Sequence, residues 1–494
     1  MNFNPNLAYF VERLQGVSTN TFKLETQNKD SAKSADIISF DLPSNAILNL
    51  RSLKVWCNAD CDGESGGSGT AGARLPPIDD LVERCEVSVG GIILSQGTNF
   101  QNVLNEAQKA VQVDYCDSVV GHPEYVRNLS YVDGTGSGPN TTRVPLTGTL
   151  NESYPSSALS RFCMQKFHGF LSSADPKLLD TSIVPDIRVR LYMASDNVLT
   201  TSAGVAIGNG AAGTGFEVGF AQNATVVGNN NGTGGAKYVL TNLHATIEAI
   251  GLADQAYDQM IAAQMGTQGF LEIPYKAYTS FQETHAGSSR FTVSTQSLDR
   301  VWVAWRKTEF NIQAAPLIVN GYKKQGGYLN KAINASYVAP DVDLGLPQYD
   351  AGGVLGTNAE KYKSQYFNFK APNETMLMQL QLNGAYMPQF SANLGELYGM
   401  TRNSLMGARE SKDMSLDQYL NNYCVQCFRL NLPDSEYSRS ISGLDTRAVN
   451  LQGIVRTEGT ATGGVASANL AINIFTESSS TLRVGAGRAI EVIS

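Results

Sequence analysis

The chain has 494 residues and a mass of 53.1 kDa, which is too long for one ordinary core and indicates roughly two to four domains. Apolar residues make up 42% and charged residues only 17%. This composition excludes a largely disordered chain, which combines low hydrophobicity with high net charge. The net charge of −8 excludes a wholly basic nucleic-acid coat.

Apolar and polar residues alternate with a period of two along the whole chain. The clearest segments are 38–42, 187–193, 243–249, 378–382 and 470–474. Such alternation is typical of strands with one buried face and one solvated face. It favours antiparallel sheets, as in sandwiches and barrels, over a buried parallel sheet.

Helical periodicity is scarce. Residues 100–111 place their apolar side chains on one face, and so do residues 254–265. In the second segment Asp254 can cap the start, and Gly266 follows the predicted end. We therefore expect two short helices on a β framework.

Three long segments between the predicted strands are expected to be surface loops. They are 58–72, which is rich in Gly and Ser, 196–236 and 321–363. Loops of about forty residues are uncommon in compact domains and are usually functional. The polar residues 1–34 have no apolar pattern and are expected to form an N-terminal arm.

The chain repeats itself weakly, and in the same order. The matching pairs are 52–56 with 297–302, 87–91 with 380–384, 100–104 with 390–394, and 162–167 with 423–428. Four matches in one order predict two similar β domains in tandem. The expected division is an arm at 1–34, a first domain at 35–252, a linking helix at 253–266 and a second domain at 267–494.

Two motifs suggest chemistry but lack the context that the chemistry needs. Residues 208–213 match GxGxxG, but no helix can start after them, so we expect a loop and no nucleotide site. Cys424 and Cys427 form a CxxC without a second pair of zinc ligands. They lie in an alternating segment, 423–432, so we expect ordinary strand cysteines.

Other candidate groups are equally isolated. Asp341 and Asp343 are the nearest approach to a glycosidase pair, and solvated loop acids are the better interpretation. His168 and His244 fall on predicted strands, and Lys323 with Lys324 is too short a basic run for phosphate binding. We predict no catalytic, metal or cofactor residues and no cofactor, which points to a structural or binding protein.

The cysteines and the glycosylation sequons give little further evidence about the class of protein. The seven cysteines are too sparse for a disulfide scaffold. No basic region followed by an apolar run opens the sequence, so no secretory signal is expected. Seven Asn-x-Ser/Thr sequons then reflect a composition rich in Asn and Thr; they are at Asn128, Asn140, Asn151, Asn223, Asn231, Asn334 and Asn373.

Several segments resemble the major capsid proteins of virophages and Polinton-like viruses. The strongest is FTVSTQSLDRVW at 291–302; the others are 36–43, 74–77, 81–90, 238–244, 257–261, 271–275 and 278–281. The resemblance implies an all-β fold of two tandem eight-stranded antiparallel jelly rolls with short helices and long surface loops. It also implies homotrimeric, pseudo-hexagonal capsomers (hexons) that tile the icosahedral shell of a double-stranded DNA virus.

The resemblance further implies a set of partners and a location. The partners are neighbouring capsomers and penton and minor capsid proteins, with no direct sequence-specific contact to nucleic acid. The location is the virion capsid, assembled inside the infected host cell, with the N-terminal arm toward the interior. Two alternatives remain open: another virion protein, such as a spike or tail component, and a β-sandwich glycan-binding protein or hydrolase.

Overall fold

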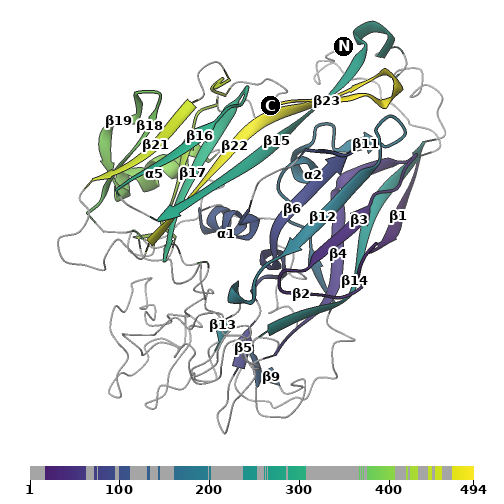
Figure 1. The fold of residues 1–494 in the computed structure, drawn as a ribbon, viewed down its shortest axis with the longest axis horizontal. Coiled ribbons are helices and arrows are strands. Elements are labelled where there is room, and N and C mark those ends of the chain that lie inside the picture. The colour runs from purple at the N-terminus through teal and green to yellow at the C-terminus, as the bar shows by residue number, and fades with distance from the viewer. Residues whose placement is uncertain are drawn as a thin grey trace, which may run out of the picture.

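The computed structural model consists of two β-rich modules with helix α1 between them (Figure 1). The structure describes residues 17–62, 72–74, 76–94, 99–111, 131–133, 143–144, 161–198, 200–201, 237–252, 261, 263, 265–284, 287–307, 367, 369, 371, 375–405, 419–420, 423–431, 443–447, 451–458 and 470–494.

The first module contains two antiparallel four-strand paths. One has the order β1-β14-β4-β10, with β2 and β11 paired to β14 and β4, and the other has the order β3-β12-β6-β7. The bounds are β1 Val17–Glu25, β2 Ala32–Lys33, β3 Ile37–Asp41, β4 Ile47–Asp62, β6 Val82–Val89, β7 Ile92–Ile93, β10 Arg161–Met164, β11 Leu178–Asp180, β12 Ile187–Met193 and β14 Lys237–Leu252.

The second module repeats this topology strand for strand. Its paths are β15-β22-β17-β20, with β23 paired to β22, and β16-β21-β18-β19. The bounds are β15 Phe270–Thr284, β16 Ser288–Val293, β17 Leu298–Lys307, β18 Leu377–Leu382, β19 Ala385–Asn393, β20 Val425–Arg429, β21 Leu451–Glu458, β22 Leu470–Gly485 and β23 Ile490–Ile493. Each module therefore has eight strands on its two main paths.

The sequence repeat coincides with this duplication. Segments 52–56 and 297–302 fall on β4 and β17, and 87–91 and 380–384 fall at the ends of β6 and β18. Segments 162–167 and 423–428 fall on β10 and β20, which hold the same position in their sheets. The predicted tandem duplication is confirmed, because each of these pairs lies on topologically equivalent strands.

The period-two pattern places the core as expected. In β12 the apolar residues Ile187, Val189, Leu191 and Met193 are buried, and the residues between them reach solvent. Because side chains on a strand alternate between the two faces, one face of β12 packs inward. In β17 of the second module residues 301–306 are all buried, Trp302 and Trp305 among them, so both faces of this strand are covered.

Two helices occupy equivalent places in the modules. Helix α1, Gln101–Val111, confirms the first predicted helix. Helix α5, Leu394–Ser404, was not predicted, although the sequence carries a capping box. The backbone N–H of Glu396 donates to Asn393 Oδ1 and the N–H of Asn393 donates to Glu396 Oε2, both at 2.9 Å.

The second predicted helix ends later than expected. Residues 261, 263 and 265–268 are helical, so the helix continues through Gly266. The chain leaves the helix at Gly269, which has φ of 77° and whose N–H donates to the carbonyl of Met265 at 2.9 Å. A glycine in the left-handed region is the usual helix terminator, and Gly266 does not take that conformation.

The first sheet begins earlier than the expected boundary at residue 35. β1 pairs with β14 from Val17↔Leu252 to Glu25↔His244, so the predicted arm cannot include Val17–Glu25. The strand escaped prediction because most of its side chains are exposed on both faces, which removes the alternation. Residues 1–16 lie outside the described residues, and the other expected domain boundaries stay predictions.

A small third sheet forms partly from segments predicted as loops. Its order is β13-β5-β8-β9, with bounds Thr200–Thr201, Gly72–Arg74, Tyr131–Asp133 and Arg143–Val144. It lies at the lower end of the first module in Figure 1. The loop predicted at 321–363 lies outside the described residues.

Gly453 of β21 tests the packing of the second core. It pairs with Phe291 of β16, and an added Cβ would lie 2.1 Å from the Phe291 ring. Because the ring is buried, we expect Gly453→Ala to lower the free energy of unfolding by about 1–3 kcal/mol. The measurement is urea unfolding.

Gly399 of α5 provides the matched control. Its added Cβ would meet nothing within 4 Å, so Gly399→Ala is expected to raise the free energy of unfolding by about 0.4–1 kcal/mol. Equal effects of the two substitutions would contradict the packing described for Phe291.

Candidate assembly surfaces

The two modules meet along one side of β15. Tyr275 is buried, its hydroxyl donates to the carbonyl of Leu94 at 3.2 Å, and its ring meets Phe170 edge-on at 5.4 Å between centroids. Tyr278 packs against His168, with ring centroids 5.1 Å apart. Aromatic pairs in these geometries are attractive beyond the area that they bury.

Backbone hydrogen bonds accompany the aromatic contacts. The N–H of Lys276 donates to Ser173 Oγ at 2.8 Å, and the N–H of Asp175 donates to the carbonyl of Pro274 at 3.0 Å. Ser173 ends the short helix α2, Phe170–Ser173. These bonds hold β15 at a defined register against the first module, which packing alone would not ensure.

Helix α1 forms the other part of this contact. It packs on β6 of its own module and on β20 of the second. The Arg306 guanidinium of β17 lies 5.6 Å from the centroid of the Phe100 ring just before the helix. Such cation–π contacts are worth more when the pair is desolvated, and Arg306 is fully buried.

A buried group of charges anchors α1 to the first module. Lys109 lies 2.8 Å from Glu106 Oε1 and 3.7 Å from Asp80 Oδ2. Burial, together with the charge of Glu106, raises the pKa of Asp80 well above its usual range. Burial opposes the charge on Lys109, but the carboxylates of Asp80 and Glu106 outweigh it and raise the pKa of Lys109.

A second buried network fixes the strands on the other side of the contact. The Lys276 ammonium donates to Asp299 Oδ2 and, at 2.9 Å, to Ser479 Oγ. Ser297 Oγ donates to Asp299 Oδ1 at 2.7 Å. The network joins β15, β17 and β22, so the Tyr275–Tyr278 segment is held by side-chain as well as ladder hydrogen bonds.

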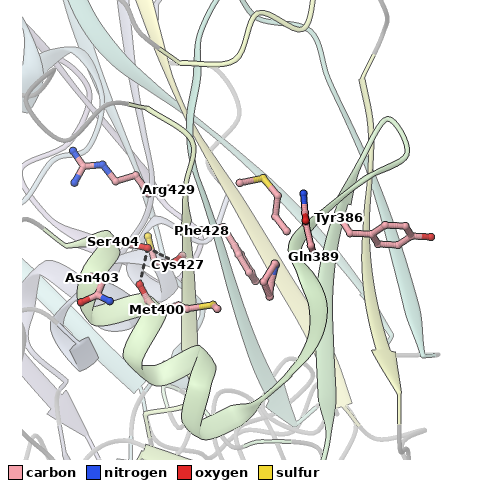
Figure 2. A pocket seen from close by; sticks show the side chains of 10 residues that line it. Tyr386, Gln389, Met400, Asn403, Ser404, Cys427, Phe428 and Arg429 are labelled. Carbon is pink, nitrogen blue, oxygen red and sulfur yellow. Dashed lines mark hydrogen bonds between the residues drawn. The ribbon is translucent and has the colours of Figure 1, made fainter.

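The second module has an apolar groove (Figure 2). Two of the elements that line it, β19 and α5, lie on the side of the second module away from the first (Figure 1). The groove has a volume of about 470 Å³ and lies between β19, α5 and β20. It is lined by Tyr386, Met387, Pro388, Gln389, Met400, Asn403, Ser404, Cys427, Phe428 and Arg429. In Figure 2 the Phe428 ring lies between helix α5 and the Gln389 strand.

Large apolar side chains reach solvent beside the groove and on β1. Phe390 of β19 is 51% exposed and Tyr386 is 37% exposed. Phe22 of β1, at the opposite end of the molecule, is 41% exposed. β19 and β1 are edge strands of their sheets. Uncovered edge strands with exposed apolar residues are sites of association between chains.

The histidines predicted on strands separate in the structure. His244 lies in β14, as expected. His168 follows the end of β10 and belongs to the contact between the modules, so its assignment to a strand is wrong. No sequence signal marked this contact, because its tyrosines have the same pattern as core residues.

The cysteine pair is buried, but its segment is not alternating. Val425, Gln426, Cys427 and Phe428 of β20 are all buried, because α5 packs on the face that would otherwise be solvated. Burial raises the pKa of both the Cys424 and Cys427 thiols to about 12. Such thiols stay protonated and are poor nucleophiles and ligands.

Most of the other motifs lie outside the described residues. These are the 208–213 glycine motif, Asp341, Asp343, Lys323, Lys324 and all seven sequon asparagines. Within the described part of the chain, no three His, Cys, Asp or Glu side chains are grouped so as to hold a metal ion. No described helix is long and apolar enough to span a membrane.

The fold is similar to those of several viral capsid proteins. A structure of PBCV-1 VP54 fitted into the virophage Sputnik aligns over 99% of both chains, with a TM-score of 0.52 and 11% identity. A PBCV-1 capsid structure aligns over 99% of both chains, with a TM-score of 0.54 and 12% identity. The fold is a double jelly roll.

The Faustovirus major capsid protein has the same double jelly roll. It aligns over 98% of this chain and 92% of its own, with a TM-score of 0.50 and 10% identity. No protein-family model and no curated protein matches the sequence. Similarity at this identity concerns the fold, and the predicted fold class is confirmed by it.

His168 makes the contact between the modules sensitive to pH. Burial, with Lys166 and Lys109 nearby, lowers the pKa of His168 to about 4, and its Nε2 is buried without a hydrogen-bond partner among the described residues. The unfolded chain binds this proton from about pH 6.5 downward, so stability falls as the pH is lowered from 6.5 to 4.

We expect His168→Phe to reduce the loss in free energy of unfolding between pH 6.5 and 4 by about 1–3 kcal/mol, because a shift of one pKa unit corresponds to about 1.4 kcal/mol. The phenyl ring keeps the stack on Tyr278 without titrating. The measurement is the free energy of unfolding from pH 4 to 7, with His244→Phe as the control for loss of an imidazole. An unchanged slope in His168→Phe would count against a neutral buried His168.

Proposed function

We propose that the chain is a major capsid protein whose trimers are the pseudo-hexagonal capsomers of an icosahedral viral shell. The observation that carries the proposal is the duplicated jelly roll, aligned over nearly the whole length of this chain and of capsid proteins. Two equivalent modules in a chain mean that three chains present six similar units around one axis.

The contact between the modules supports a rigid building block. Buried aromatic, cation–π and backbone contacts join the modules, so a trimer of such chains has a defined outline. Closed rings built from repeated head-to-tail contacts avoid open polymerisation. A rigid outline of this kind is what a lattice of repeated capsomers requires.

The proposed partners follow from this role. They are two further copies in the capsomer, neighbouring capsomers, and penton and minor capsid proteins, in a virion assembled in the infected cell. The net charge of −8 fits a shell protein that leaves neutralisation of the genome to other proteins. We propose no catalytic activity, and the polar clusters at the contact between the modules serve to position strands and α1.

The mass of the purified protein in solution tests the proposal. Three chains of 53.1 kDa total 159.3 kDa, and we expect this mass by light scattering after size exclusion, with hexagonal outlines in negative stain. A stable monomer of 53.1 kDa would contradict a capsomer and turn attention to a glycan-binding protein or hydrolase. An elongated trimer that does not tile would indicate a spike or tail protein.

A further inference from the structure

One of the two equivalent helices is covered within the chain and the other is not. In the first module, α1 and the segment after β10 receive β15, β17 and β20 of the second module. In the second module, α5, β19 and β20 hold the equivalent positions. There they line an open apolar groove instead of receiving another module.

The sequence repeat places the groove at the same point as the internal contact. Segment 87–91 matches 380–384, and the strand pairs that follow these segments have the same register, so Met387 corresponds to Leu94. The carbonyl of Leu94 accepts the hydrogen bond from Tyr275 of β15. Met387 lines the groove, so the groove lies where a strand equivalent to β15 would dock.

That equivalent strand is β1, and the strand registers identify the docking residues. Val55 of β4 pairs with Ala245, which pairs with Leu24 of β1. The matching Val301 of β17 pairs with Thr476, which pairs with Thr279 of β15. Leu24 of β1 and Thr279 of β15 therefore hold equivalent positions. The four residues before each are also equivalent, so residues 20–23 of β1 take the place of residues 275–278.

The side chains of β15 are covered at this segment, whereas those of the equivalent segment of β1 are exposed to solvent. The docked segment of β15 includes Tyr275, which is 3% exposed, whereas in the equivalent segment of β1 Phe22, the counterpart of Ala277, is 41% exposed. β1 and β19, the strand that borders the groove, lie toward opposite ends of the long axis in Figure 1, so one chain cannot bring β1 to its own groove. The groove is apolar, and Phe22 is the one apolar side chain of residues 20–23. Each of these surfaces lacks the cover that its counterpart has within the chain.

We propose that the groove of one copy receives β1 of a second copy, with Phe22 packed against the groove beside Phe390. The contact repeats between chains the arrangement that joins the modules within each chain. Because it is head to tail, it closes only as a ring of chains. The inference rests on the proposed capsomer and specifies which surfaces of this chain meet in it.

Two substitutions test the contact from its two sides. Phe22→Asp and Phe390→Asp place a charge in the contact without touching either core, because both rings are exposed. We expect each purified variant to lose the trimer and to elute at 53.1 kDa. Leu444→Asp, at an apolar side chain that is 40% exposed, is the control and keeps the trimer mass. Unchanged thermal unfolding midpoints show that the variants are folded.

Mixing the two variants tests the pairing itself. The Phe22→Asp chain keeps an intact groove and the Phe390→Asp chain keeps an intact β1, so together they form one good contact. We expect a mixture in equal amounts to give a dimer of 106.2 kDa, twice the 53.1 kDa chain, and no closed ring. A mixture that stays monomeric would overturn the pairing of β1 with the groove.

The outcomes separate this inference from the proposed function. If the wild type is a trimer and a folded Phe22→Asp or Phe390→Asp variant is a trimer as well, the proposed contact is wrong, while the proposed capsomer is not contradicted. A wild-type monomer would overturn both. Loss of the trimer in both variants, with a dimer on mixing and an intact Leu444→Asp trimer, supports the contact.

Discussion

The docking of β15 against α1 and α2 is the contact on which the rest of the molecule depends. Tyr275 and Tyr278 bury their rings on Phe170 and His168, and backbone bonds from Lys276 and Asp175 set the register. Without this contact the modules would be two separate sandwiches on a linker. With it, the groove and β1 are held at opposite ends of one rigid body (Figure 1).

Two groups of charged side chains lie on elements that form this contact. Lys109 and its two carboxylates hold α1 against the first module, while Lys276 and Asp299 hold β15 within the second. Buried charges are costly unless they are paired, and both lysines pair with carboxylates. The buried thiols of Cys424 and Cys427 likewise pack, and their raised pKa values favour the protonated form.

Of the two equivalent sets of contact surfaces that the duplication creates, one is buried within the chain and the other is exposed. α1 is covered by the second module, while α5 borders an open groove. β15 is covered at Tyr275, while β1 exposes Phe22. A chain with one filled and one unfilled copy of the same contact has the means to join further copies head to tail, which is the property that a capsomer subunit needs.

The all-β class, the strands with one solvated face, helix α1 and the tandem repeat could be predicted from the residues alone, because each depends on local periodicity or composition. Sequence patterns missed β1, whose faces are both exposed. The alternation expected at Cys424–Cys427 is wrong, because α5 covers the face of β20 that would otherwise be solvated. Which tyrosines join the modules, and where the groove lies, could be seen in the folded chain alone. The tyrosines contact residues more than a hundred positions away, and the groove depends on how β19, α5 and β20 pack together, which no local pattern records.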